Sequence, residues 1–320
     1  MARNTNINQL LFPVDLKPVY IQGNRRPIEG YKAVVGTFQI DGNLVGLDQV
    51  ISIVTDNYML ISNKEAVEMA KDIHHQLFPG GSSDSFEVFN IKAPKTFGSC
   101  HIDIIDKNYT LNLMRKEVYV PFVRIQNSYN KTMPLSFMVG FCRKLCDNGV
   151  IFEENTISIN LRHTKSHFRS FDLNKINTNL LKNFERDFIT KTEKATSIAI
   201  PGKLFTPLAI KALNLQFKTE DKNEKVKKKE LDRLEDFIHT MEYYTDRYVR
   251  KENFGETAYA FFNAITDYAS NFPHLQARST HTMQGRCGNW LTEFCDKYYK
   301  KAIDWEKELQ EYNFKSAKEL

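Results

Sequence analysis

The chain has 320 residues, of which 42% are hydrophobic and 26% charged, the composition of an ordinary soluble globular protein. No apolar run approaches the ~18 residues of a membrane-spanning helix, and the polar N-terminus lacks the apolar segment of a secretory signal. Lys and Arg exceed Asp and Glu by 44 to 39, so the net charge of +5 permits a polyanionic partner without requiring one. We therefore expect a cytoplasmic protein with reduced cysteines and no membrane association.

The first half of the chain predicts mainly β-strands. Residues 1–30 have no clear period and are interpreted as an irregular lead-in. From Tyr31 onward, short alternating runs bounded by turn residues indicate an antiparallel sheet. These runs cover residues 31–40, 49–62, 86–92, 100–106, 118–128, 135–142 and 156–163. One helix interrupts them, because Ser62 and Glu65 have capping-box spacing ahead of an apolar stripe.

From about residue 172 the apolar period becomes helical. The expected helices cover residues 172–192, 230–251, 256–270 and 288–308. The charged segment 217–230 is interpreted as a solvated linker, with a polyanion-binding patch as the alternative. The sequence thus predicts an α+β fold, a curved antiparallel sheet with packed helices followed by a helical C-terminal third. We expect a β-rich core over residues 31–216 and a helical region over 217–320 packed on that core.

Motifs of nucleotide-binding and hydrolytic enzymes are absent from the chain. It contains no phosphate-binding loop, dinucleotide fingerprint, H-E-x-x-H pair or nucleophile elbow. Asp103, Asp106 and Lys107 resemble a magnesium-dependent nuclease site only locally. We therefore assign no catalytic residue and expect no cofactor.

Two cysteines and two histidines have a loosely finger-like spacing. They are Cys142, Cys146, His163 and His167, which are zinc-compatible residue types. Basic residues between the cysteines would repel a cation, so buried thiols and strand-end histidines are the simpler interpretation. We assign no metal ligand.

The most informative feature is the basic segment 162–169, which directly follows a predicted strand. Its Arg and Lys side chains can contact phosphates, and its phenylalanine offers a stacking face for a base. Further cations on or beside neighbouring strands would extend the patch if the sheet brings them together. The nucleic-acid-binding candidates are Arg162, His163, Lys165, Phe168, Arg169, Arg143, Lys144 and Arg124. The alternative is a solvated strand exit whose cations pair with carboxylates.

Several short motifs, in this order along the chain, carry a family resemblance. They are the segment from Val54 to Tyr58 before an aliphatic stretch, the turn at 127–132, the Arg-x-x-Cys-x-Asn motif at 143–148, the Arg-His-Thr strand end at 162–164, and the helical segment 263–268. The chain resembles the phage/plasmid-like proteins grouped as domain of unknown function 932, over about residues 30–300. Tyr129 and Asn130 depart from the His-Asp pair of that family's turn. The resemblance implies a phage, prophage or plasmid context and a bacterial host cytoplasm, without an established activity.

These observations favour a DNA-metabolism protein that binds single-stranded DNA, with annealing in recombination as a candidate role. Bases would stack on Phe168 or Tyr129, and homo-oligomer formation through the helix at 230–251 would extend the groove. Two alternatives remain open. One is an anti-defence protein that binds a host protein, and the other is a metal-dependent nuclease that requires Asp103.

Overall fold

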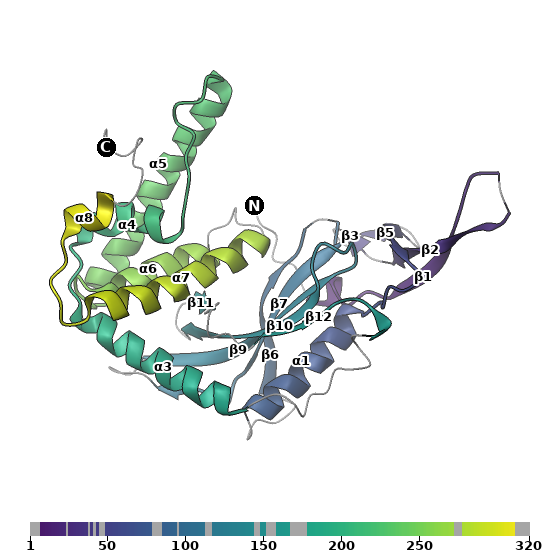
Figure 1. Ribbon diagram of the computed structural model, residues 1–320, viewed down its shortest axis with the longest axis horizontal. Helices are drawn as coiled ribbons and strands as arrows, with labels where there is room; N and C mark the ends of the chain where they lie inside the picture. Colours follow the sequence, from purple (N-terminus) through teal and green to yellow (C-terminus); the bar gives the residue numbers. More distant parts are fainter. Residues whose placement is uncertain are drawn as a thin grey trace.

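Two larger antiparallel sheets, a short two-stranded sheet and a set of helices make up the computed structural model (Figure 1). The structure describes residues 7–23, 25–37, 39–40, 43–44, 49–78, 85–94, 96–112, 117–143, 148–151, 158–166, 178–271 and 277–310. Strands dominate as far as residue 161, and helices dominate from residue 178 onward. The predicted α+β class is therefore confirmed.

The larger sheet has the strand order β11-β10-β9-β7-β6, and β12 also pairs with β10 while β8 pairs with β9. Its strands are β6 (Phe86–Lys92), β7 (Ser99–Asp106), β8 (Leu111–Asn112), β9 (Val118–Ser128), β10 (Leu135–Arg143), β11 (Asn148–Val150) and β12 (Ser158–Leu161). All of the pairings are antiparallel. The alternating runs of the sequence thus predicted β6, β7, β9, β10 and β12 with small shifts at their ends, whereas the short strands β8 and β11 were not predicted.

The smaller sheet has the order β1-β2-β5 and projects to one side of the molecule (Figure 1). Its strands are β1 (Val14–Tyr20), β2 (Pro27–Gly36) and β5 (Gln49–Thr55), and a short β3–β4 pair (Gln39–Ile40, Asn43–Leu44) lies between the last two along the chain. The interpretation of residues 1–30 as irregular was wrong for β1. Pro18 weakens the strand pattern there, and the structure accommodates it because β1 is an edge strand.

The first helix, α1 (Asn63–Leu77), begins as the sequence predicted. The Ser62 hydroxyl accepts a hydrogen bond from the backbone N–H of Glu65 at 3.1 Å, and the Glu65 carboxylate accepts one from the backbone N–H of Ser62 at 2.7 Å. These two bonds form the capping box, which satisfies amides that the first turn leaves unpaired. Ala66, Ala70 and Ile73 share one hydrophobic cluster with the apolar face of the larger sheet.

The remaining helices are α3 (Thr178–Ser197), α4 (Phe205–Ala212), α5 (Glu224–Asp246) with a π-helical end (Arg247–Lys251), α6 (Ala258–Asn271), α7 (Ala277–Tyr298) and α8 (Trp305–Gln310). The sequence did not predict α4, and it placed the start of α7 at Gly288. The first turns of α7 carry buried polar side chains rather than an apolar stripe. Hydrophobic periodicity therefore did not predict this part of the helix. None of the described helices combines the length and apolarity needed to cross a bilayer.

The two faces of the larger sheet differ in chemistry. Ile102, Ile104, Val123 and Ile125 belong to the main hydrophobic cluster, together with residues of α1 and α3. These two helices lie on the same side of the larger sheet (Figure 1). The opposite face carries buried polar side chains, of which Arg124 of β9 bonds to Gln284 of α7 and Lys92 of β6 bonds to residues of α6 and α7. Arg124 and Asp103, two residues that the sequence suggested for a functional site, lie on this buried polar face.

Candidate nucleic-acid interface

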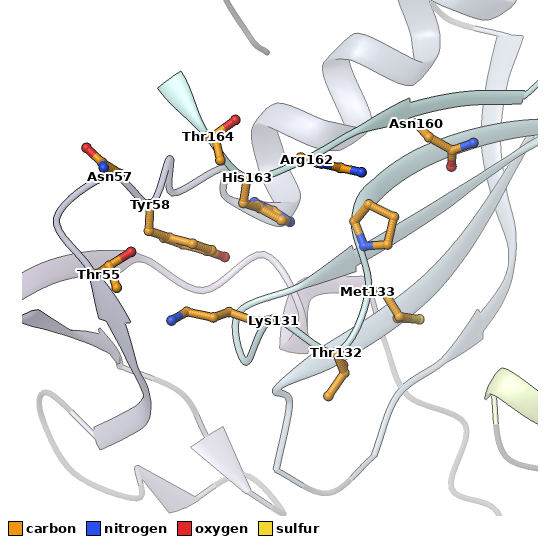
Figure 2. Close-up of a pocket in the computed structure, with 11 residues that line it drawn as sticks. Thr55, Asn57, Tyr58, Lys131, Thr132, Met133, Asn160, Arg162, His163 and Thr164 are labelled. Carbon is orange, nitrogen blue, oxygen red and sulfur yellow. The ribbon is translucent and has the colours of Figure 1, made fainter. Parts of the chain in front are cut away.

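An open cleft of about 500 Å³ lies where the smaller sheet meets the end of the larger one. Three segments distant in sequence form it: the end of β5 and the residues after it, the β9–β10 turn, and β12 with its exit. The cleft is lined by Thr55, Asn57, Tyr58, Lys131, Thr132, Met133, Pro134, Asn160, Arg162, His163 and Thr164 (Figure 2). The Arg162–Thr164 part of the predicted basic segment therefore lies in a cleft rather than on a flat surface.

Tyr58 and His163 form the floor between the two sheets. Their rings stack with centroids 5.0 Å apart and an interplanar angle of 16° (Figure 2). The Tyr58 hydroxyl donates a hydrogen bond to the Ser128 carbonyl at 2.9 Å, which ties the ring to the end of β9. Since both side chains are buried and Tyr58 also forms a β-bridge with Thr164, this floor is a rigid part of the fold.

Backbone and side-chain bonds hold His163 in one orientation. The Met59 amide donates to the His163 carbonyl at 3.0 Å, and the His163 Nδ1 lies 3.1 Å from the Met59 carbonyl oxygen. Burial lowers the pKa of His163 below its ordinary value, although the bond to Met59 acts in the opposite direction. The ring is therefore neutral at pH 7, and it adds no charge to the cleft.

The positive charge of the cleft comes from Lys131 and Arg162. Both side chains are exposed, and neither forms an ion pair within the described part of the chain. Figure 2 shows Lys131 beneath the Tyr58 ring and Arg162 beyond His163. The lining contains no acidic residue, so the cleft has a net positive charge and favours an anionic ligand. Lys165 follows on the same segment and is also exposed.

The structure brings together only some of the candidates named from the sequence. Arg162 and His163 line the cleft, and Lys165 directly follows Thr164, the last lining residue along the chain. Lys144, Phe168 and Arg169 lie outside the described residues. Lys131 was missed as a site residue because the sequence indicates only a turn at that position, not which strand end the turn approaches.

Arg124 is not a surface cation, so its prediction as a phosphate contact was wrong. Its side chain is 1% exposed and forms two 2.6 Å bonds to the Asp103 carboxylate. A third bond, of 2.5 Å, runs to the Gln284 side chain on α7. The β7–β9 register places Asp103 directly opposite Arg124, on the polar face that the helices cover. The predicted nuclease carboxylate is thus half of a buried ion pair.

The prediction that Arg143 contacts phosphates was also wrong, because this side chain is buried and ion-paired. Its side chain is 2% exposed and pairs with the carboxylates of Glu117 and Glu252, each at 2.5 Å. The rings of Tyr248 and Phe254 also lie beside the guanidinium, at 5.9 and 5.0 Å from their centroids. Arg143 therefore joins β10 to the helical region and cannot reach a phosphate.

Tyr129 is also unsuitable as a stacking platform. The side chain is 1% exposed, and its ring packs edge-on against Phe12 with centroids 5.9 Å apart. Its hydroxyl accepts a hydrogen bond from the Asn63 backbone at 2.8 Å, at the start of α1. The residue belongs to the core that joins the smaller sheet to α1.

Cys142 and His163, the two described residues of the finger-like spacing, do not come together in space. Leu161 of β12 pairs with Leu135 at the start of β10, whereas Cys142 lies seven positions further along that strand. At about 3.3 Å per residue, Cys142 is therefore ~23 Å from the strand end that carries His163. Cys146 and His167 lie outside the described residues. Among the described residues, no three His, Cys, Asp or Glu side chains are grouped so that they could hold a metal ion.

A protein-family model matches most of the chain. The family, described as Domain of unknown function (DUF932), matches residues 50–287, well over half of the sequence. The chain therefore belongs to this family, and the resemblance noted in its short motifs is confirmed. No curated protein and no solved structure matches the chain.

Proposed function

We propose that this member of the family of domain of unknown function 932 binds single-stranded DNA at the cleft between its two sheets. One observation carries the proposal: an open cleft with two exposed cations, an aromatic floor and no acidic residue in its lining. Phosphates are recognised by Arg and Lys, and unpaired bases by hydrogen bonds to their edges. A single strand supplies both groups at once.

The cleft suits a single strand better than a duplex. Its cations lie on two separate loops that flank a recess of about 500 Å³, and a recess admits an unstacked base, whereas a paired base stays inside its helix. The role that we propose is DNA metabolism in a phage or plasmid context, with annealing of complementary strands as the candidate activity. Assembly of several copies would align their clefts into a longer path for the strand.

The test is the binding of a fluorescent oligo(dT) across a salt series. Arg162→Ala and Lys131→Ala should each weaken binding and reduce the slope of log affinity against log salt by about 0.7, the change expected for one lost phosphate contact on a single strand. Lys228→Ala is the matched control, because Lys228 is an exposed lysine on α5, which lies at the opposite end of the molecule from the smaller sheet (Figure 1). An equal loss in the control would place the nucleic acid on α5 and remove the cleft assignment.

A second candidate function, binding to a host protein, is supported by a different surface. Large apolar side chains on or next to the β1-β2-β5 sheet are exposed: Tyr20 (55%), Ile21 (61%), Tyr31 (50%), Val50 (64%) and Ile53 (53%). Exposed aromatic and aliphatic groups are typical of protein interfaces. In this case DNA binding would be weak in wild-type protein and in the Arg162→Ala variant alike. Ile53→Asp would abolish association with the host partner.

A further inference from the structure

The His163 side chain offers the cleft a hydrogen-bond acceptor, because of its tautomer. A backbone carbonyl can only accept a hydrogen bond, so the 3.1 Å contact with the Met59 oxygen requires the proton on Nδ1. A neutral imidazole carries one N–H, which leaves Nε2 with a free lone pair. Burial favours the neutral ring by lowering its pKa.

This Nε2 atom has no partner within the described residues. It is buried, and no donor of the described chain reaches it, although His163 lines the cleft. A buried acceptor without a hydrogen bond is unfavourable, so a ligand that supplies a donor gains affinity at this point. Because Nε2 is buried, a ligand reaches it only when side chains that line the cleft move.

The chemistry of this acceptor excludes the phosphate as its partner. A phosphodiester has oxygen acceptors and no N–H or O–H at neutral pH, so it can bind Arg162 and Lys131 but not Nε2. A nucleobase has ring N–H or exocyclic amino donors on its pairing edge, and a single strand leaves this edge free. The cleft therefore separates into a cationic rim that suits phosphate and a neutral accepting group that suits a base.

We propose that the cleft takes up one unpaired base, whose N–H donates a hydrogen bond to Nε2 of His163 while Arg162 and Lys131 contact the flanking phosphates. This inference rests on the proposed binding of single-stranded DNA and adds the recognition of a base edge to it. It predicts that affinity depends on a donor in the base, and not only on charge and length.

The direct test compares oligo(dT) with the same oligonucleotide built from N3-methylthymidine, which lacks the ring N–H. Wild-type protein should bind the methylated strand about two- to tenfold more weakly, the range for one neutral hydrogen bond. His163→Phe keeps an aromatic ring beside Tyr58 but has no acceptor, so it should bind the two strands equally. A methyl group that merely clashed would still weaken binding in His163→Phe, and that result would overturn the inference.

The two proposals fail in distinguishable ways. Equal binding of both strands by wild-type protein, with Arg162→Ala still weakening both, would overturn base recognition and leave the DNA-binding function intact. Absence of binding to either strand would overturn the function itself. If His163→Phe does not fold, ¹⁵N NMR of wild-type protein replaces it. The His163 Nε2 resonance should shift on addition of oligo(dT) and not of dimethyl phosphate, a phosphodiester without an O–H, and an unchanged resonance would overturn the inference.

Discussion

Replacement of Arg124 by methionine tests whether this cation stabilises the fold and takes no part in binding. In the wild-type chain the guanidinium and the Asp103 carboxylate are each 1% exposed and joined by two 2.6 Å bonds. Arg124→Met leaves that carboxylate buried without its partner and also removes the bond to Gln284. Removal of one partner from a buried ion pair costs about 3–5 kcal/mol.

The expected change in melting temperature follows from the size of the chain. With an unfolding entropy of ~2.1 cal/mol/K per residue, 320 residues give about 0.7 kcal/mol per degree. Arg124→Met should therefore melt about 4–7 °C below wild type in a calorimetric scan. Its affinity for oligo(dT) at 20 °C should be unchanged, because the side chain does not reach the surface.

A double variant tests whether the ion pair is the cause. Asp103→Leu combined with Arg124→Met replaces both charges by apolar groups, and such replacements of buried pairs are often close to neutral. The double variant should recover most of the stability lost in the single one. If Arg124→Met lost less than about 1 kcal/mol, or if the two substitutions were additive, the buried ion pair would not be the cause of the lost stability. If Arg124→Met remained folded but lost affinity for DNA, the conclusion that Arg124 lies outside the interface would be refuted.

Two further predictions concern stability. His74 is fully buried, and both of its ring nitrogens lack a partner in the described structure. Burial lowers its pKa to about 4, and the nearby Asp106 only partly offsets this. The unfolded chain, with a histidine pKa of about 6.5, therefore binds the proton more tightly than the folded chain, so stability falls as pH falls between these values. This residue alone accounts for about 2 kcal/mol between pH 7 and pH 5. Urea unfolding of His74→Leu at the two pH values should show a pH dependence shallower by that amount, and a dependence as steep as that of wild type would contradict the assignment. Ser62→Ala removes the capping-box acceptor of α1 and should cost about 1 kcal/mol, with binding unchanged. Lys64→Ala, an exposed neighbour in the same first turn, serves as its control, and equal losses in the two variants would show that the cap is not responsible.

The sequence by itself determined the elements whose signals are local. The capping box at Ser62 and Glu65 and the apolar period after it define α1, because a helix cap involves residues only three apart. Alternation likewise identified the longer strands of the larger sheet, including β6 over Phe86–Lys92, but not the short strands β8 and β11. The basic strand end at Arg162 was visible as well, since its residues are consecutive.

Only the tertiary structure decided which cations face solvent. Arg124 and Arg162 look alike in the sequence, but the β7–β9 register places Asp103 opposite Arg124, whereas Arg162 follows the end of β12 and stays exposed. The cleft itself depends on contacts between residues about 30 to 100 positions apart, such as Met59 with His163. Strand register and packing fix burial, ion pairing and even the tautomer of a histidine, and these are properties of neighbours in space that no local pattern records.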